Sequence, residues 1–146
     1  MTIALVEFSE AEIEIRAVRD TVFGDEQNVP QEVNWDGNDE ECLHALARGE
    51  RSEVVATGRL APDGKIGRLA VLRLYRGKGV GAQVLRKLLE TARGRGLSQV
   101  YLHAQAQTVG FYEQEGFQLR GAPFSEGGIT HRYMVLTFQD DGGEAG

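Results

Sequence analysis

The chain has 146 residues, of which 22 are acidic and 16 basic, so its net charge at pH 7 is −6. This length predicts one domain that can bury a substantial core, and the acidic balance argues against nucleic acid as the main partner. A single cysteine, Cys42, excludes an internal disulfide framework and favours a reducing, cytoplasmic compartment. We expect no membrane partner and no export signal, because no apolar run is long enough and the N-terminus lacks a signal-peptide pattern.

The first part of the chain predicts a strand followed by a helix. Residues 2–8 are rich in β-forming side chains and predict the strand. Ser9 and Glu12 form an S-x-x-E capping pattern, which predicts that a helix begins there. Apolar residues at helical spacing continue this helix towards Gly24, where we expect it to end, well before Pro30.

Residues 24–41 form an acidic connection that contains no lysine or arginine. A charge run of this kind is usually a solvated surface loop. Val29, Val33 and Trp35 interrupt it, however, so we expect the segment to pack against the domain. A packed acidic segment beside a catalytic cleft would attract a cationic amine. The sequence leaves both interpretations open.

The rest of the chain predicts strands that alternate with helices. Strands are expected at 42–47, 54–60, 66–72, 100–104, 117–119 and 133–138, and helices at 80–94 and 107–114. A turn is expected at 62–64 and a loop at 122–128. This order predicts an α/β fold with a mixed sheet and a single domain over residues 1–138, followed by a disordered polar tail at 139–146.

A glycine-rich turn between strand 66–72 and the following helix carries the first functional signal. Its sequence, RGKGVG at 76–81, places three glycines and two cations where the helix begins. Glycines let backbone amides converge, and a helix N-terminus adds unpaired N–H groups and a positive dipole end, so the turn suits a phosphate or pyrophosphate. A P-loop needs Ser or Thr after Lys78, and the dinucleotide fingerprint needs G-x-G-x-x-G spacing, so neither fits. A turn that serves only strand–helix packing is the structural alternative.

This turn resembles the R/Q-x-x-G-x-G/A signature of the GNAT acyl-CoA N-acetyltransferases. Further along, GFYEQEGF at 110–117 resembles the second hallmark of that family, an apolar residue, Tyr, a short polar run and Gly-Phe. Other positions resemble the ElaA/YjcF-like branch of the family: Val22-Phe23, Glu26-Gln27, Val29-Pro30, Asp36, Asp39, His44, Ala104-Gln105 and His131. The resemblance covers residues 12–138 and implies the GNAT fold, in which strand 66–72 and the next strand splay apart to admit the acyl-CoA.

The resemblance also implies roles for particular residues. The pyrophosphate would bind the turn and first helical residues, Arg76, Gly77, Lys78, Gly79, Val80, Gly81 and Ala82. The pantetheine arm would bind backbone groups of Leu69, Ala70 and Val71, with the Val71 N–H as oxyanion donor. Tyr112 would protonate the departing thiolate. This proton transfer is uphill, because the reference pKa of a phenol is about 10 and that of a thiol about 8.5, so the tyrosine must be well positioned. Gln105 stands where many family members have an Asn that contacts the cofactor.

Deprotonation of the acceptor is the harder chemical problem, because an alkyl amine of pKa about 10.4 needs about 4.6 kcal/mol to become neutral at pH 7. Glu26, Asp36, His44 and His131 are the substrate-site candidates, and Glu32 and His103 are further candidate bases. Each histidine also has a structural interpretation, and no common base can be transferred from the family. Cys42 and His44 share one strand face, but nothing activates the thiol, and the scattered His and Cys residues predict no metal site.

These observations predict an N-acetyltransferase that moves the acetyl group of acetyl-CoA, its co-substrate, to a primary amine by direct attack on the thioester. Polyamines, amino sugars, antibiotics and protein amines all remain as acceptors, and the acidic segment favours a small cationic one. Either a monomer or a homodimer fits the sequence. The main alternative is a module that binds acyl-CoA without transferring the acyl group, and a dinucleotide- or nucleoside triphosphate-binding enzyme is a third.

Overall fold

The computed structural model describes residues 1–139 of the chain, so the predicted tail lies, apart from its first residue, outside the described residues. The strands are β1 (Thr2–Glu7), β2 (Leu43–Arg48), β3 (Val54–Leu60), β4 (Ile66–Val71), β5 (Gln99–Gln105), β6 (Gln118–Glu126) and β7 (Ile129–Thr137). The α-helices are α1 (Glu12–Arg19), α2 (Gln31–Asn34), α3 (Val80–Gly94) and α4 (Val109–Gln114). Shorter or wider helical segments are η1 (Phe8–Glu10), η2 (Asp20–Glu26), η3 (Asp39–Glu41), η4 (Arg73–Tyr75) and η5 (Ala106–Thr108).

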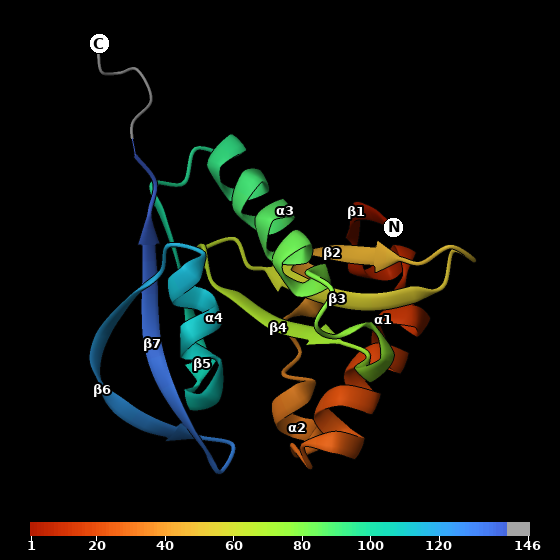
Figure 1. Ribbon diagram of the computed structural model, residues 1–146, viewed down its shortest axis with the longest axis horizontal. Helices are drawn as coiled ribbons and strands as arrows, with labels where there is room; N and C mark the ends of the chain where they lie inside the picture. The colour runs from red at the N-terminus through yellow and green to blue at the C-terminus, as the bar shows by residue number, and fades with distance from the viewer. Residues whose placement is uncertain (140–146) are drawn as a thin grey trace.

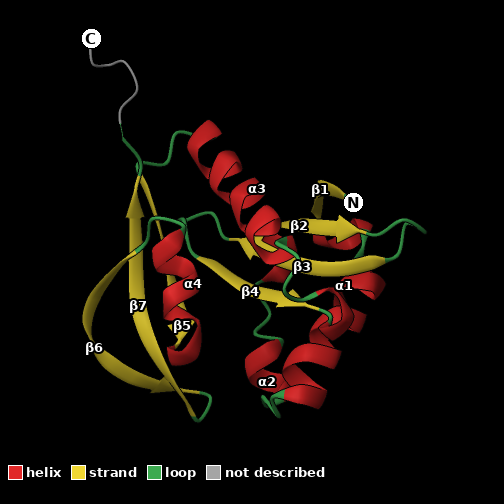
Figure 2. Cartoon of the chain, viewed as in Figure 1, coloured by secondary structure: helices red, strands yellow, loops and turns green. Residues whose placement is uncertain are grey.

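The strands form two antiparallel sheets that meet along the middle of the molecule (Figure 1). The first has the order β1-β2-β3-β4 and the second the order β5-β7-β6. One parallel bridge, between Lys65 and Tyr101, joins the base of β4 to the start of β5. The helices α1 and α3 pack on the first sheet, and α4 lies beside the second (Figure 2). The predicted α/β fold with mixed strand pairing is confirmed.

The main core lies between α3 and the two sheets. Val84, Leu85 and Leu88 of α3 are fully buried at helical spacing, as the sequence predicted. Opposite them on β3 stands Gly58, where an added Cβ would lie 3.1 Å from Leu88 Cδ1 and 3.2 Å from Val84 Cγ1. Because glycine has no Cβ, α3 can approach the sheet closely enough to fix the start of this helix beside β4.

Three local predictions were wrong. The helix α1 begins after Ala11, because the capping carboxylate is that of Glu10, which accepts the Glu7 N–H at 2.7 Å and closes η1 instead. The chain stays helical past Gly24 as the wide π-helix η2, since Val22 and Phe23 are buried there. The acidic connection at 24–41 is not a single loop, because it contains the end of η2, all of α2 and all of η3. The expected loop at 122–128 lies largely in β6, which pairs with β7 through residue 126.

In the described part of the chain, no helix combines the length and apolar character that a membrane crossing requires.

Candidate active site

The two sheets separate immediately beyond their single bridge. Tyr101 N–H donates to the Gly64 carbonyl at 3.1 Å at the base, and from there β4 and β5 diverge. β4 also carries a bulge, because the register with β3 shifts between Thr57 and Arg59. Arg68 lies in this bulge with a φ of 51°, a left-handed conformation that few residues other than glycine adopt. The separation from β5 leaves one edge of β4 open beyond the bridge.

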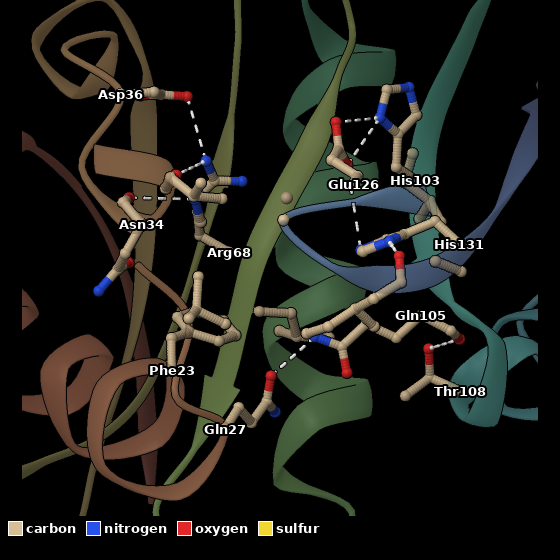
Figure 3. A pocket seen from close by; sticks show the side chains of 18 of the residues that line it. Phe23, Gln27, Asn34, Asp36, Arg68, His103, Gln105, Thr108, Glu126 and His131 are labelled. Carbon is tan, nitrogen blue, oxygen red and sulfur yellow. Dashed lines mark hydrogen bonds and ion pairs between the residues drawn. The ribbon is translucent and has the colours of Figure 1, made fainter. Parts of the chain in front are cut away.

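A cavity of about 420 Å³ occupies the opening between the diverging strands. One wall comes from η2, α2 and the residues after it, the floor from β4, and the other wall from β5 and the β6–β7 hairpin (Figure 3). The predicted residues that line it are Asp36, Leu69, Gln105, Tyr112 and His131, together with the candidate bases Glu32 and His103. The fold therefore brings together residues from four separate parts of the sequence.

The backbone of β4 presents free groups along its open edge. Leu72 N–H donates to the Val55 carbonyl of β3 at 2.9 Å. Because successive residues of a strand point their amides to opposite sides, the Val71 N–H faces away from β3, towards the side that β5 has left. The Val71 carbonyl faces the same way, since it accepts the Arg76 Nε–H at 2.8 Å. This orientation is the one that the predicted oxyanion donor requires, whereas Ala70 is buried among η2 and α1 side chains.

The glycine turn leads from β4 into α3 with two left-handed residues. Gly77 has a φ of 77° and Gly79, the N-cap, a φ of 80°, and both positions border open space. The first helical bond runs from Gln83 N–H to the Gly79 carbonyl at 3.1 Å, so the amides just before Gln83 have no helical acceptor. A Cβ at Gly81 would only make ordinary contact with Val71 and Phe111. The turn thus combines unpaired amides with open space in front of them.

The cations of the turn have different surroundings. Arg76 is held by Val71 and also by Glu26, to whose Oε1 its Nη2 donates at 2.6 Å. The Lys78 ammonium lies 5.8 Å from the ring centroid of Tyr75 and has no carboxylate partner among the described residues. Glu26, a substrate-site candidate in the sequence analysis, therefore pairs with the turn and is not among the residues that line the cavity. Val80 is buried in the core, so its side chain is not available to a ligand at the turn.

Tyr112 reaches the cavity from α4. Its ring makes edge contacts with Phe111 and Phe117, at centroid distances of 5.0 and 5.7 Å, which fix its direction. Burial raises the pKa of Tyr112 to about 12. Its hydroxyl has no hydrogen-bond partner within residues 1–139, so the proton of this neutral phenol is available to a ligand.

Two glutamines cross the cavity from opposite walls. Gln105 at the end of β5 donates to Gln27 Oε1 at 2.7 Å (Figure 3). It also accepts from Gln107 Nε2 at 2.7 Å. Gln27 was quoted in the sequence analysis only as part of a resemblance, and no local pattern marks it as a cavity residue. The contact arises because η2 brings the N-terminal segment across to β5.

An ion-pair network fixes the α2 wall. Arg59 of β3 donates to the two carboxylate oxygens of Asp36 at 3.0 and 2.5 Å and to Asp39 at 2.9 Å. Arg68 donates to Asp36 at 3.2 Å and to two α2 carbonyls at 2.6 and 3.2 Å. Burial would raise the pKa of Asp36, but the bonds from Arg59 and the neighbouring backbone hold it well below its usual range. Asp36 thus lines the cavity as a carboxylate that two arginines already neutralise, and it does not accept a proton near pH 7.

Arg19 completes this network inside the protein. It is fully buried and donates to Asp39 Oδ1 at 2.5 Å and to Asn34 Oδ1 at 3.2 Å. Its guanidinium also lies 3.9 Å from the centroid of the Trp35 ring. Burial lowers the pKa of Arg19 to about 10 despite the adjacent Asp39, so the side chain stays charged at neutral pH.

His44 and Cys42 lie outside the cavity, on the far side of this network. The His44 ring is buried, donates from Nε2 to the Asp39 carbonyl at 3.0 Å and packs 5.3 Å from the Phe8 ring. Burial lowers the pKa of His44 and raises the pKa of the Cys42 thiol. Among the described residues, no group of three His, Cys, Asp or Glu side chains is arranged to hold a metal ion.

The opposite wall contains a carboxylate that the sequence analysis did not single out. Glu126, at the end of β6, lies with its Oε1 3.2 Å from His103 Nδ1 and 3.9 Å from His131 Nε2 (Figure 3). Its stretch was expected to be a loop, so nothing in the sequence placed it beside these histidines. Only the pairing of β6 with β7 does so.

Comparison with known proteins agrees with this geometry. A model of the acetyltransferase (GNAT) domain matches residues 5–138. The uncharacterized N-acetyltransferase YjcF of Bacillus subtilis (strain 168) is 36% identical over 121 residues, which cover 81% of this chain and 86% of YjcF. The crystal structure of Escherichia coli ElaA superposes with a TM-score of 0.82 at 31% identity, covering 93% of this chain and 99% of that one. An acyl-CoA N-acyltransferase from Pseudomonas aeruginosa superposes with a TM-score of 0.81 at 26% identity, with coverage of 93% and 99%.

The fold and the open edge of β4 are thus those of an acyltransferase scaffold. The chain belongs to the GNAT acetyltransferase family. The predicted resemblance, including that to the ElaA/YjcF-like branch, is confirmed.

Proposed function

We propose that the protein is an N-acetyltransferase that uses acetyl-CoA as co-substrate and a small primary amine as acceptor. The observation that carries this proposal is the Tyr112 hydroxyl, which is unpaired and enters the cavity beside the open edge of β4. The pyrophosphate would bind the unpaired amides of the turn at 77–82, with Lys78 as its mobile counter-ion. The pantetheine arm would then run along Leu69, Ala70 and Val71 into the gap between the strands.

The chemistry follows from where these groups point. The neutral amine attacks the thioester carbonyl carbon, and the Val71 N–H stabilises the negative charge that develops on the carbonyl oxygen. The C–S bond then breaks. Because the pKa of Tyr112 is about 12, it cannot hold a negative charge at neutral pH. Tyr112 therefore gives its proton to the thiolate sulfur and takes one proton from the attacking nitrogen. The products are then the neutral amide and the free thiol.

The test is the substitution Tyr112→Phe, which removes the hydroxyl but keeps the ring contacts. A positioned general acid contributes about 10²- to 10⁴-fold, so we expect kcat to fall within that range. The affinity for acetyl-CoA, measured by calorimetry, should change by less than about twofold, because the backbone carries the binding. Tyr101→Phe is the matched control, since that hydroxyl donates to Asp63 at the base of the strands and not into the cavity.

Two outcomes overturn this proposal. Unchanged turnover of Tyr112→Phe at every pH removes Tyr112 from the mechanism. Selective acetyl-CoA binding without any product from a broad panel of amines makes the protein a binding module rather than a transferase.

A further inference from the structure

The register of the second sheet gathers three titratable side chains on its cavity face. Gln105 of β5 pairs with His131 of β7, and Glu126 of β6 pairs with Ile129. Because side chains two residues apart share a face, His103, His131 and Glu126 all project to the same side. That side borders the cavity opposite α2.

The hydrogen bonds define where each imidazole carries its proton. His131 Nδ1 lies 2.8 Å from the Ile129 carbonyl, which only accepts, so Nδ1 is the donor and Nε2 keeps a lone pair in the neutral ring. His103 Nδ1 lies 3.2 and 3.3 Å from the two oxygens of Glu126, so it is also a donor. Burial and the nearby Lys65 lower the pKa of His103, although Glu126 opposes them. A neutral His103 holds the Glu126 carboxylate in place without cancelling its charge.

Glu126 differs in this respect from Asp36 on the opposite wall. Asp36 is matched by Arg59 and Arg68, whereas within the described residues Glu126 forms ion pairs only with the two histidines. The other charged groups lining the cavity are Lys65 before β4, Arg68 on β4 and the exposed Glu32 on α2. Of these, Arg68 already donates hydrogen bonds to the Val33 carbonyl and to Asp36 on the α2 wall. Glu126, whose side chain is 42% exposed, is therefore the carboxylate on the β6–β7 wall, and among the described residues it has no permanent cation as partner.

The spacing of two acceptor atoms fits one ammonium group. Glu126 Oε1 and His131 Nε2 are 3.9 Å apart. A nitrogen that donates to both at ordinary distances of about 2.8–3.0 Å can sit between them, with the two acceptors about 80–90° apart as seen from the nitrogen, so each hydrogen bond is bent by about 10–15° from the N–H direction. Such a nitrogen would lie in the cavity that Gln105 and Tyr112 also line.

We propose that Glu126 binds the ammonium group of the acceptor and that His131 Nε2 removes its first proton, with His103 as the residue that positions Glu126. This inference rests on the proposed transferase function and assigns its acceptor site. In the step, the R–NH₃⁺ group loses one proton to the Nε2 lone pair of His131, which becomes imidazolium beside the Glu126 carboxylate. The resulting R–NH₂ attacks the thioester, and the imidazolium later releases its proton to water. The class of acceptor is thus a primary alkylammonium ion.

The test compares Glu126→Gln, His131→Gln and His103→Gln, with Glu50→Gln as a control that removes one charge from the distant β2–β3 turn. Propylamine, putrescine and the weakly basic amine aniline, which is neutral at pH 7, are the acceptor probes, with acetyl-CoA as donor. We expect Glu126→Gln to raise KM for the two cations at least tenfold and to leave KM for aniline unchanged. His131→Gln should lower kcat for the cations at least about 10²-fold and remove the fall of kcat/KM on the acid side of the pH profile. His103→Gln should raise KM for the cations with little change in kcat.

Calorimetric titration of the CoA-bound protein with putrescine separates this inference from the proposed function. Loss of putrescine binding in Glu126→Gln but not in Glu50→Gln supports the acceptor site even if the wild type gives no product. Wild-type turnover together with an unchanged KM in Glu126→Gln overturns the role of Glu126. An acid-side fall that persists in His131→Gln overturns the role of His131.

Discussion

Removal of the Asp39 charge tests the buried network most directly. Asp39 accepts from Arg19 at 2.5 Å and from Arg59 at 2.9 Å. Without the Asp39 charge, Arg59 still pairs with Asp36, but Arg19 has no second carboxylate partner among the described residues. The substitution Asp39→Asn therefore leaves the fully buried Arg19 charge without a counter-ion. Removing one partner of a buried pair costs about 3–5 kcal/mol, and we expect about 3 kcal/mol because the Asn oxygen still accepts one bond.

The assay is urea unfolding at pH 7, followed by tryptophan fluorescence of Trp35, which stacks on Arg19. For a chain of this length, a loss of 3 kcal/mol corresponds to a fall in Tm of about 6–12 °C. Glu14→Gln is the matched control, because it also removes one carboxylate from an arginine pair. The side chains of that pair are 30% and 42% exposed, so its loss should cost no more than about 1 kcal/mol.

A second variant distinguishes charge from packing. The double substitution Arg19→Met with Asp39→Leu removes both buried charges, and it should recover part of the stability that Asp39→Asn loses. A loss in Asp39→Asn that is no larger than the loss in Glu14→Gln would refute the reasoning. It would show that the Arg19 charge is solvated or compensated by other means.

The remaining predictions concern pH and the glycine turn. Burial would raise the pKa of Asp39, but the bonds from Arg19 and Arg59 outweigh it and hold this pKa below its usual range. The ionised Asp39 therefore stabilises the fold fully above pH about 4, and this stabilisation is lost as the pH falls through the lowered pKa. The difference in urea midpoint between wild type and Asp39→Asn should therefore shrink from pH 7 to pH 3, and a constant difference would contradict this sign. Gly79→Glu should weaken acetyl-CoA binding at least tenfold in calorimetry, or by about 1.4 kcal/mol. Gly96→Glu is the control, because Gly96 has the same left-handed conformation at the opposite end of α3, and it should leave the affinity for acetyl-CoA unchanged. Equal losses of affinity in both variants would make the turn purely structural.

The sequence marks the proposed donor half of the site more clearly than the proposed acceptor half, for a physical reason. The glycine turn and Tyr112 each lie in a continuous motif, so local spacing is enough to find them. The acceptor wall depends on contacts between distant segments, such as Glu126 with His103. Glycines and a proline around 121–128 suggested a loop there, and strand pairing with β7 overrode that local preference.

The acidic connection also shows that local sequence does not reveal contacts between distant segments. Its composition left open a solvated surface loop or a packed acidic segment that attracts a cation, and the segment does pack beside the cavity. The arginines that neutralise Asp36 and Asp39 come from α1, β3 and β4, where nothing in the local sequence marks them as partners. His44 likewise lies next to the segment in sequence but points into a structural hydrogen bond.

The open edge of β4 has a consequence for how such a protein can change over evolution. In the proposed function, the groups it offers to the donor are main-chain amides and carbonyls, which every amino acid except proline supplies alike. The proposed acceptor wall, in contrast, consists of side chains on β5, β6 and β7, each replaceable by a single substitution. This proposal therefore makes recognition of the donor resistant to mutation, whereas the choice of acceptor can change one residue at a time.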